Sequence, residues 1–187
     1  MTYEEIIFDV EERMEKAVDV LRSALAGIRT GRANPGLVDS LKVEAYGSPT
    51  PMKQLASVGA PEPTQIVIRP YDPGTLKDIE KAIIASELGF NPQSDGQVIR
   101  INIPPLSTEV RRKMVARVRE LSEEAKVSIR NVRRDGNKAA EQSEKDKILT
   151  EDERDAARKE IQELTKKYEN QVNEIAKERE KQVMEDE

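Results

Sequence analysis

The sequence lacks cysteine, tryptophan and histidine altogether, and only 3% of its 187 residues are aromatic. Without cysteine, the chain forms no disulfide, offers no thiol nucleophile and holds no iron–sulfur cluster. Without histidine as well, the usual zinc sites and a histidine general base are excluded. Carboxylates and lysines remain available for proton transfer, so these absences argue against an enzyme without excluding one. We expect no metal site and no cofactor.

Long apolar runs are missing too. No stretch approaches the ~20 apolar residues of a membrane span. The acidic start MTYEEIIFDVEER lacks the basic region and apolar run of a secretory signal. We therefore expect a cytoplasmic protein with no membrane partner. Charged residues make up 36% of the chain, whereas about a quarter is usual. With so few aromatics, this composition favours long helices or partial disorder over one large globule.

Proline and glycine are unevenly distributed. All ten prolines lie between Pro35 and Pro105, and seven of the nine glycines lie between Gly31 and Gly96. Because proline breaks helix interiors, the flanks of the chain can form long helices and the middle cannot. The middle is therefore predicted to be a separate body of strands, turns and short helix.

Apolar residues recur at steps of four and three in both flanks, which predicts three amphipathic helices. The first covers about residues 2–29 and ends near Gly31. The second begins after Pro105 with Ser107 as its N-cap and runs to about residue 147, although Gly136 is a weak point. The third begins at Thr150, which forms a capping box with Glu153. The expected stripes are Val10, Met14, Ala17, Leu21, Ala24, Ile28; Val110, Met114, Val118, Leu121, Ala125, Ser128, Val132; and Ala157, Ile161, Leu164, Tyr168, Val172, Ile175.

These patterns predict a two-domain α+β protein. Three helices that are each too polar to stand alone bury their stripes in a long antiparallel bundle made of residues 1–30 and 105–187. Residues 31–104 form a small inserted mixed α/β domain. Its expected strands are 41–45, 55–58, 65–69 and 97–103, and its expected helix is 75–86. Since the bundle consumes all three stripes, we expect a monomer.

Nucleotide-binding and catalytic motifs are absent: the sequence has no Walker A loop, no G-x-G-x-x-G and no nucleophile elbow. Charge segregation is the informative signal. The net charge is −3 over residues 1–30, −1 over 31–104, +4 over 105–149 and −5 over 150–187. Residues 111–134 alone hold nine basic and three acidic side chains.

The basic residues of the second helix share one side. At ~100° per residue, they fall within a narrow sector, and the expected apolar stripe points almost oppositely. We call this set the basic ridge: Arg112, Arg119, Lys126, Arg130 and Arg133. Arginine suits bidentate phosphate recognition, which indicates binding to a nucleic-acid backbone. The alternative is a solvated face paired with acidic side chains of the other two helices. Periodicity alone leaves both open.

Four motifs together resemble those of the bacterial ribosome recycling factor family. They are IRTGRANP from Ile28, YGSPTPMKQLA from Tyr46, INIPPLSTEVRRK from Ile101 and RNVRRD from Arg130, and the resemblance covers essentially the whole chain. It implies a factor that is not an enzyme. With elongation factor G and GTP, it would split the post-termination 70S ribosome into subunits and release it from mRNA. Its helical domain would lie on large-subunit ribosomal RNA.

The resemblance also implies which residues contact RNA. They are Arg130, Arg133 and Arg134, with Arg111 or Arg112 at the start of the same helix, whereas Arg119 and Lys126 rest on the ridge geometry alone. It further favours a hinge at the two chain crossings, formed by Thr30, Gly31, Arg32, Pro104 and Pro105. Without the resemblance, the sequence alone indicates that these residues are ordinary helix terminators.

Two other functions compete with ribosome splitting. One is a helical adaptor or cochaperone that binds proteins through its bundle, for which the basic ridge would be dispensable. The other is an RNA-cleaving enzyme, for which the sequence offers no credible catalytic group.

Overall fold

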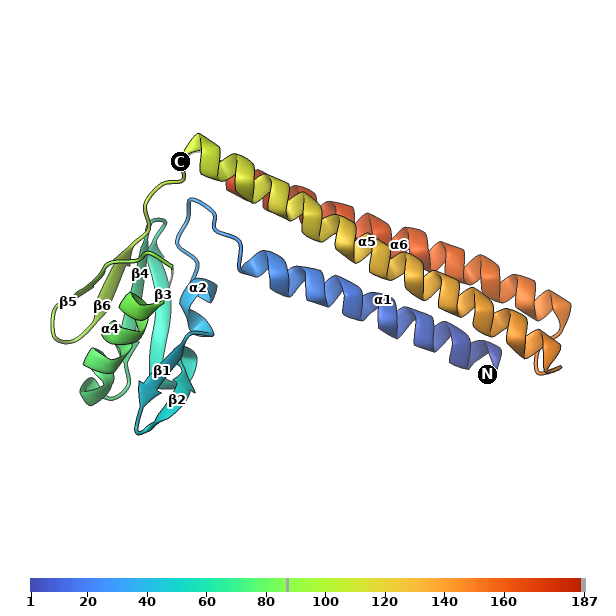
Figure 1. Ribbon diagram of the computed structural model, residues 1–187, viewed down its shortest axis with the longest axis horizontal. Coiled ribbons are helices and arrows are strands. Elements are labelled where there is room, and N and C mark those ends of the chain that lie inside the picture. Colours follow the sequence, from blue (N-terminus) through green and yellow to red (C-terminus); the bar gives the residue numbers. More distant parts are fainter. Residues whose placement is uncertain (87, 186–187) are drawn as a thin grey trace. The chain divides into compact units, whose positions relative to one another are not determined.

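The computed structural model describes residues 1–86 and 88–185, and this part of the chain separates into two compact units (Figure 1). The helical unit comprises Met1–Leu25 and Lys113–Lys181. The small unit comprises Ala26–Arg112 and the segment that begins at Gln182. The predicted α+β class, with long helices and a small β-containing part, is confirmed. The exact domain bounds 31–104 remain a prediction.

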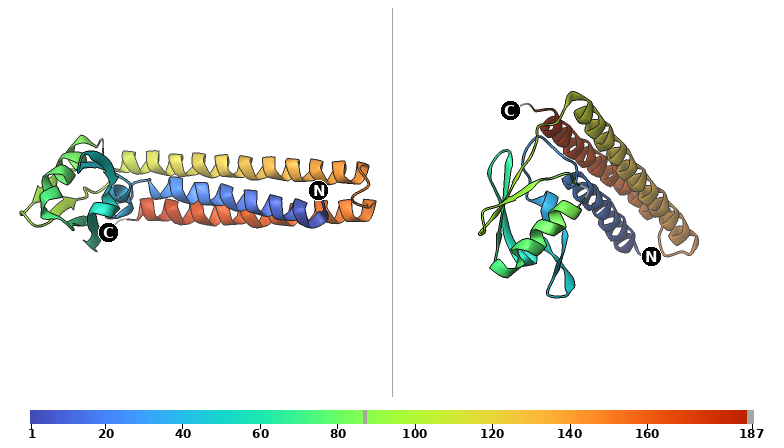
Figure 2. Two further views of the ribbon diagram at one scale, coloured as in Figure 1. Left: turned by 90° about the horizontal axis from the view of Figure 1, so that it is seen from below. Right: turned by 60° about the vertical axis from the view of Figure 1, so that its left-hand side comes forward.

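The helical unit is built from α1 (Tyr3–Ala26), α5 (Thr108–Lys145) and α6 (Glu151–Met184), which lie side by side in both views of Figure 2. Helix α1 runs antiparallel to α5, since Arg13 of α1 pairs with Asp135 at 2.7 Å while Ala24, further along α1, lines a groove with Leu121, earlier on α5. It runs parallel to α6, since the hydroxyl of Tyr3 donates to Glu160 and that of Tyr168 faces Glu11. The predicted antiparallel three-helix bundle is therefore confirmed.

The helix starts follow the predicted capping residues. The hydroxyl of Ser107 accepts a hydrogen bond from the backbone N–H of Val110 at 3.2 Å. Thr150 accepts from the N–H of Glu153 at 3.2 Å, and the Glu153 carboxylate accepts from the Thr150 hydroxyl at 3.3 Å. Both caps satisfy N–H groups that a helix leaves without an intrahelical partner. Helix α1 ends at Ala26, three residues before the predicted end.

Gly136 lies in the interior of an unbroken α5 and is buried against both other helices. A Cβ atom at this position would lie 2.6 Å from Val10 Cγ2 and 3.1 Å from Ile161 Cδ1. The glycine therefore permits a close approach of three helices, and the predicted continuation of the helix through Gly136 is confirmed. The lower helix propensity of glycine is the cost of that packing.

The buried face of α5 is rotated from the predicted stripe. Leu121 is only half-buried and Ser128 is exposed, whereas Ser122 and Ile129 are buried. Small side chains recur along this face, which lets the neighbouring helices approach closely. Its buried residues are Val118, Ser122, Ala125, Ile129, Val132, Gly136, Ala140 and Ser143.

The small unit contains two antiparallel sheets (Figure 1). Its elements in chain order are α2 (Gly36–Asp39), β1 (Lys42–Ala45), β2 (Ser48–Pro51), α3 (Met52–Leu55), β3 (Ala56–Glu62), β4 (Gln65–Pro70), a 3-10 turn η1 (Pro73–Thr75), α4 (Leu76–Ala85), β5 (Pro92–Ser94) and β6 (Ile99–Asn102). Strands β1 and β2 form a hairpin, and the larger sheet has the order β3-β4-β6-β5.

The core of the small unit lies beneath α4, where Ile79 and Ile83 are fully buried with Ile66 and Ile68 of β4. The four predicted strands correspond to β1, β3, β4 and β6, and the predicted helix corresponds to α4. Strand β2 is not predicted by the sequence pattern because two of its four residues are prolines, which depress strand propensity. Elements α2, α3 and β5 are not predicted either, since they have only three or four residues each.

Candidate nucleic-acid interface

The structure places all seven predicted RNA-contact residues on α5. Arg112, Arg119 and Arg134 are exposed, and the other four are partly exposed. Arg111 and Arg112 lie in the first turn of α5, within the small unit, whereas the remainder belong to the helical unit. The stretch of α5 from Arg119 to Arg134 measures about 22 Å at 1.5 Å per residue.

The basic ridge does not point away from the buried face of α5. At ~100° per residue, Arg119, Lys126, Arg130 and Arg133 lie about a quarter of a turn from the centre of that face. The prediction of an opposite orientation is wrong, because burial is centred on Ser122 and Ile129 instead of Leu121 and Ser128. This part of the ridge borders α6 as a consequence.

Two ridge arginines form ion pairs with α6. The Nε of Arg119 lies 3.0 Å from Glu180 Oε1. Arg130 lies 3.2 Å from Glu169 Oε1 through Nε, and 3.3 Å from Glu123 Oε1 through Nη1. The structural alternative, in which ridge charges pair with a neighbouring helix, therefore holds for these two residues. Such surface pairs contribute about 0–1 kcal/mol each, so a phosphate can displace the carboxylate.

A shallow groove of about 320 Å³ follows this border of α5 and α6. Its charged lining is mixed, with three basic and two acidic side chains. The lining residues are Arg119, Ser122, Glu123, Lys126, Asn173, Ala176, Lys177 and Glu180. The groove provides amide and hydroxyl groups beside the cations, as a contact to phosphates and sugars of folded RNA requires. It offers no aromatic side chain on which a base could stack.

Arg133 and Arg134 lie about one helical turn beyond Arg130, outside the residues that line this groove. Within the described part of the chain, neither has an ion-pair partner. Their acidic neighbour Asp135 is engaged by Arg13 at 2.7 Å, and this hydrogen bond is the main reason that the pKa of Arg13 is raised. No acidic residue stands three or four positions from Arg133 or Arg134 on α5, so the two guanidinium groups remain available for an external anion.

The predicted hinge residues lie in segments between helices and strands. Thr30, Gly31 and Arg32 follow α1, and Pro104 and Pro105 separate β6 from α5. The hydroxyl of the buried Thr30 accepts from the N–H of Arg32 at 3.4 Å. A Cβ atom on Gly31 would meet nothing within 4 Å.

Other kinds of site receive no support in residues 1–86 and 88–185. No cluster of acidic side chains there is arranged to hold a metal ion. No helix in that part of the chain combines the length and the apolar character needed to cross a bilayer.

Comparison with known proteins identifies the family. The family model described as ribosome recycling factor matches residues 21–184. The chain is 73% identical over 140 residues to the ribosome-recycling factor of Rhodopirellula baltica, covering 75% of each chain. It is 50% identical over 181 residues to that of Symbiobacterium thermophilum, covering 97% of this chain and 98% of the relative.

Solved structures agree with these sequence relatives. A solution structure of ribosome recycling factor superposes with a TM-score of 0.78 at 42% identity, covering 97% of both chains. A second structure describes the T. thermophilus ribosome recycling factor and the E. coli elongation factor G bound to the E. coli post-termination complex. Its matching chain gives a TM-score of 0.69 at 42% identity, covering 99% of this chain and 100% of that one. The chain belongs to the ribosome recycling factor family.

Proposed function

We propose that this chain splits the post-termination 70S ribosome into subunits together with elongation factor G and GTP, which releases the ribosome from mRNA. The observation that carries this proposal is the relation to recycling factors over nearly the full length of both chains. A solved relative that covers this chain almost completely is described with elongation factor G on a post-termination complex. The role is mechanical, and the partner's GTP hydrolysis supplies the energy.

Subunit splitting tests the proposal directly. Post-termination ribosomes are mixed with elongation factor G and GTP, with or without this chain, and subunit release is followed by light scattering. We expect acceleration that requires all three components. A rate equal to that of elongation factor G alone would overturn the proposal, and acceleration without GTP would remove the partner's role.

The contact with large-subunit ribosomal RNA is proposed to lie on α5, with Arg133 and Arg134 as its centre. Their support is the absence of an ion-pair partner among the described residues and of an acidic residue three or four positions away on α5. Lys126 and Arg130 extend this surface along α6, and Arg119 extends it further after exchanging Glu180 for a phosphate. Arg111 and Arg112 would add contacts at the start of α5.

Arg133→Ala tests this surface. Since the side chain is partly exposed, the variant should keep its helical circular dichroism spectrum and its unfolding midpoint. Its affinity for large ribosomal subunits should fall about tenfold, which corresponds to one charge-assisted contact of about 1.4 kcal/mol. Lys166→Ala, which removes an exposed cation from α6, is the matched control and should leave the affinity unchanged. Equal affinities of both variants would contradict the assignment.

A hinge at the two connecting segments is the third part of the proposal. Gly31 lacks a Cβ and has open space where one would lie, so it can absorb a change of φ and ψ, while Pro104 and Pro105 stiffen the other connection. Fluorophores attached to one position in each unit should report a broad distribution of distances in solution. Replacement of Gly31 by Pro should narrow it. A single narrow distance in the unaltered chain would contradict the hinge.

A further inference from the structure

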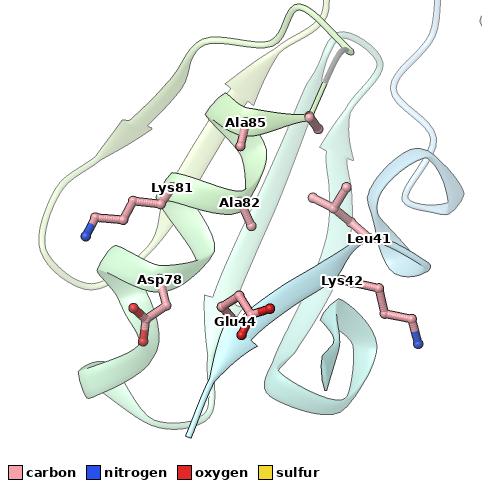
Figure 3. A pocket seen from close by; sticks show the side chains of 8 residues that line it. Leu41, Lys42, Glu44, Asp78, Lys81, Ala82 and Ala85 are labelled. Carbon is pink, nitrogen blue, oxygen red and sulfur yellow. The ribbon is translucent and has the colours of Figure 1, made fainter. Parts of the chain in front are cut away.

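The small unit has a groove of about 500 Å³ along the seam where α4 packs against β1 (Figure 3). Leu41 and Glu44 line its β1 side, and Asp78, Ala82 and Ala85 line its α4 side. This volume falls within the ordinary range of binding pockets, roughly 300–1,000 Å³. Neither the basic ridge nor the hinge includes any of these residues, so the groove belongs to no site described above.

Small side chains on α4 leave this space unfilled. Asp78, Ala82 and Ala85 recur at steps of four and three, so they share one face of the helix. Alanine ends at Cβ and therefore covers little of the neighbouring β1. Together with the half-buried Leu41, the two alanines form an apolar floor at one end of the groove (Figure 3). An apolar side chain from outside can lie on this floor.

The other end of the groove is acidic. Asp78 is half-buried and lies across from the exposed Glu44 (Figure 3). Within the described chain, neither carboxylate has an ion-pair partner. Lys42 and Lys81 also line the groove, but both extend away from the space between β1 and α4 (Figure 3). Because two carboxylates repel each other when no cation lies between them, this end of the groove attracts a positive group.

An exposed aromatic ring borders the acidic end. Tyr46 lies two residues beyond Glu44, and its side chain is 73% exposed. Its hydroxyl donates to Asp72, and this hydrogen bond is the main reason that the pKa of Tyr46 is raised, to which the charge of Asp78 also contributes. The ring is thus held close to Asp78. A guanidinium group can pair with carboxylates and stack on such a ring at the same time.

We propose that this groove binds an arginine side chain of a partner protein, together with an apolar residue next to that arginine. The guanidinium would lie between Asp78 and Glu44, beside the ring of Tyr46, and the apolar neighbour would lie over Ala82 and Ala85. Arginine fits better than lysine because its planar group pairs with two carboxylates and stacks on an aromatic face. The ligand lies on top of the seam, so β1 and α4 keep their contact.

Charge and sequence select a partner protein over the other possible occupants. The carboxylates repel the phosphates of RNA. A second copy of this chain offers no matching pair of residues, because none of the large apolar side chains exposed in residues 1–86 and 88–185 stands next to an arginine in the sequence. The occupant is therefore an arginine with an apolar neighbour on the surface of another protein.

The test titrates the full-length ¹⁵N-labelled chain with synthetic peptides and follows its backbone amide resonances. The blocked probes are Ser-Arg-Leu-Ser and Ser-Leu-Arg-Ser, since the direction of the bound segment is open. At least one should give saturable shifts of the amides of Glu44, Asp78 and Ala82. Replacement of its arginine by citrulline, which has a similar shape and no charge, should weaken binding at least about tenfold. Replacement of its leucine by serine should weaken binding as well.

Matched variants locate the contact. Asp78→Asn and Glu44→Gln each remove one carboxylate of the groove, and each should weaken binding of the arginine peptide about tenfold. Glu62→Gln removes the same charge from an exposed position on β3, outside the lining, and should have no effect. Ala85→Leu fills the apolar end, so the peptides with leucine and with serine should then bind equally. Amide spectra of each free variant verify the fold.

Any of four results would overturn the proposal. The first is the absence of saturable shifts at millimolar peptide, and the second is equal binding of the arginine and citrulline peptides. The third is a short oligouridylate that shifts the same amides, which would make the occupant RNA. The fourth is a shift of these amides with the concentration of the chain alone, which would make the occupant a second copy. All four leave ribosome splitting untouched, so failure here is distinct from failure of the proposed function.

Discussion

Gly136→Ala probes the close approach of the three helices at this glycine. Alanine is favoured over glycine by about 1 kcal/mol in a helix interior. The added Cβ, however, would lie 2.6 Å from Val10 Cγ2 and 3.1 Å from Ile161 Cδ1. Val10 is β-branched and fully buried, so it has little freedom to move. Overpacking of a core costs about 1–3 kcal/mol, and we therefore expect a net loss of up to about 2 kcal/mol in the free energy of unfolding.

Urea unfolding followed by circular dichroism at 222 nm measures this loss. Ala116→Gly is the matched control in the same helix: Ala116 is exposed, so its replacement should cost only the propensity difference of about 1 kcal/mol. The reasoning is refuted if Gly136→Ala raises the free energy of unfolding by about 1 kcal/mol, as an exposed helical glycine would.

A double-mutant cycle tests whether the Val10 side chain is responsible for the clash. Val10→Ala removes Cγ2 and leaves a small cavity, which destabilises the bundle by itself. In its presence, Gly136→Ala should become neutral or stabilising, with a coupling free energy of about 1–2 kcal/mol. Additive effects would show that Val10 does not limit the approach of the helices.

Three further predictions concern single groups. Burial raises the pKa of Tyr168 to about 12, above the value of about 10 in the unfolded chain. The stabilising contribution of the protonated Tyr168 is therefore complete below about pH 10 and is lost as the pH rises towards about 12. Tyr168→Phe should flatten the alkaline loss of stability measured by urea unfolding. Thr150→Ala removes the N-cap of α6 and should cost about 1 kcal/mol in the same assay. The N–H groups of Val98 and Gln97, and then Arg100, hold the pKa of Asp95 well below its usual range. Its stabilising effect should thus be lost only in strong acid, and carboxyl NMR should still find a lowered pKa in Arg100→Gln.

Residue patterns predicted the architecture because its strongest determinants are local. The distribution of prolines separated the helical flanks of the chain from the mixed α/β segment between them. Ser107 and Thr150 marked two helix starts that the structure confirms. The short elements escaped prediction because their stability comes from tertiary contacts. Strand β2, for example, exists through its pairing with β1, despite two prolines.

The face of α5 could not be predicted from its apolar residues alone. Ser122 and Gly136 are buried because small residues allow α1 and α6 to approach. A stripe drawn through the large apolar residues of the sequence does not include such small residues. The same rotation of the buried face placed the basic ridge at the border of α6 instead of on the outward side of the helix. Neither the ion pair of Arg130 with Glu169 nor that of Arg119 with Glu180 carries a sequence signal, because nothing local specifies the register of two helices.

The most direct test of the proposed RNA contact on α5 is the salt dependence of binding to large ribosomal subunits. The unaltered chain, the double variant Arg133→Ala with Arg134→Ala, and the control Lys166→Ala are compared at several potassium chloride concentrations. Each lost phosphate contact should reduce the slope of log affinity against log salt by about 1. We therefore predict that the double variant loses a slope of about 2 as well as affinity, while the control matches the unaltered chain. An unchanged slope in the double variant would contradict the account.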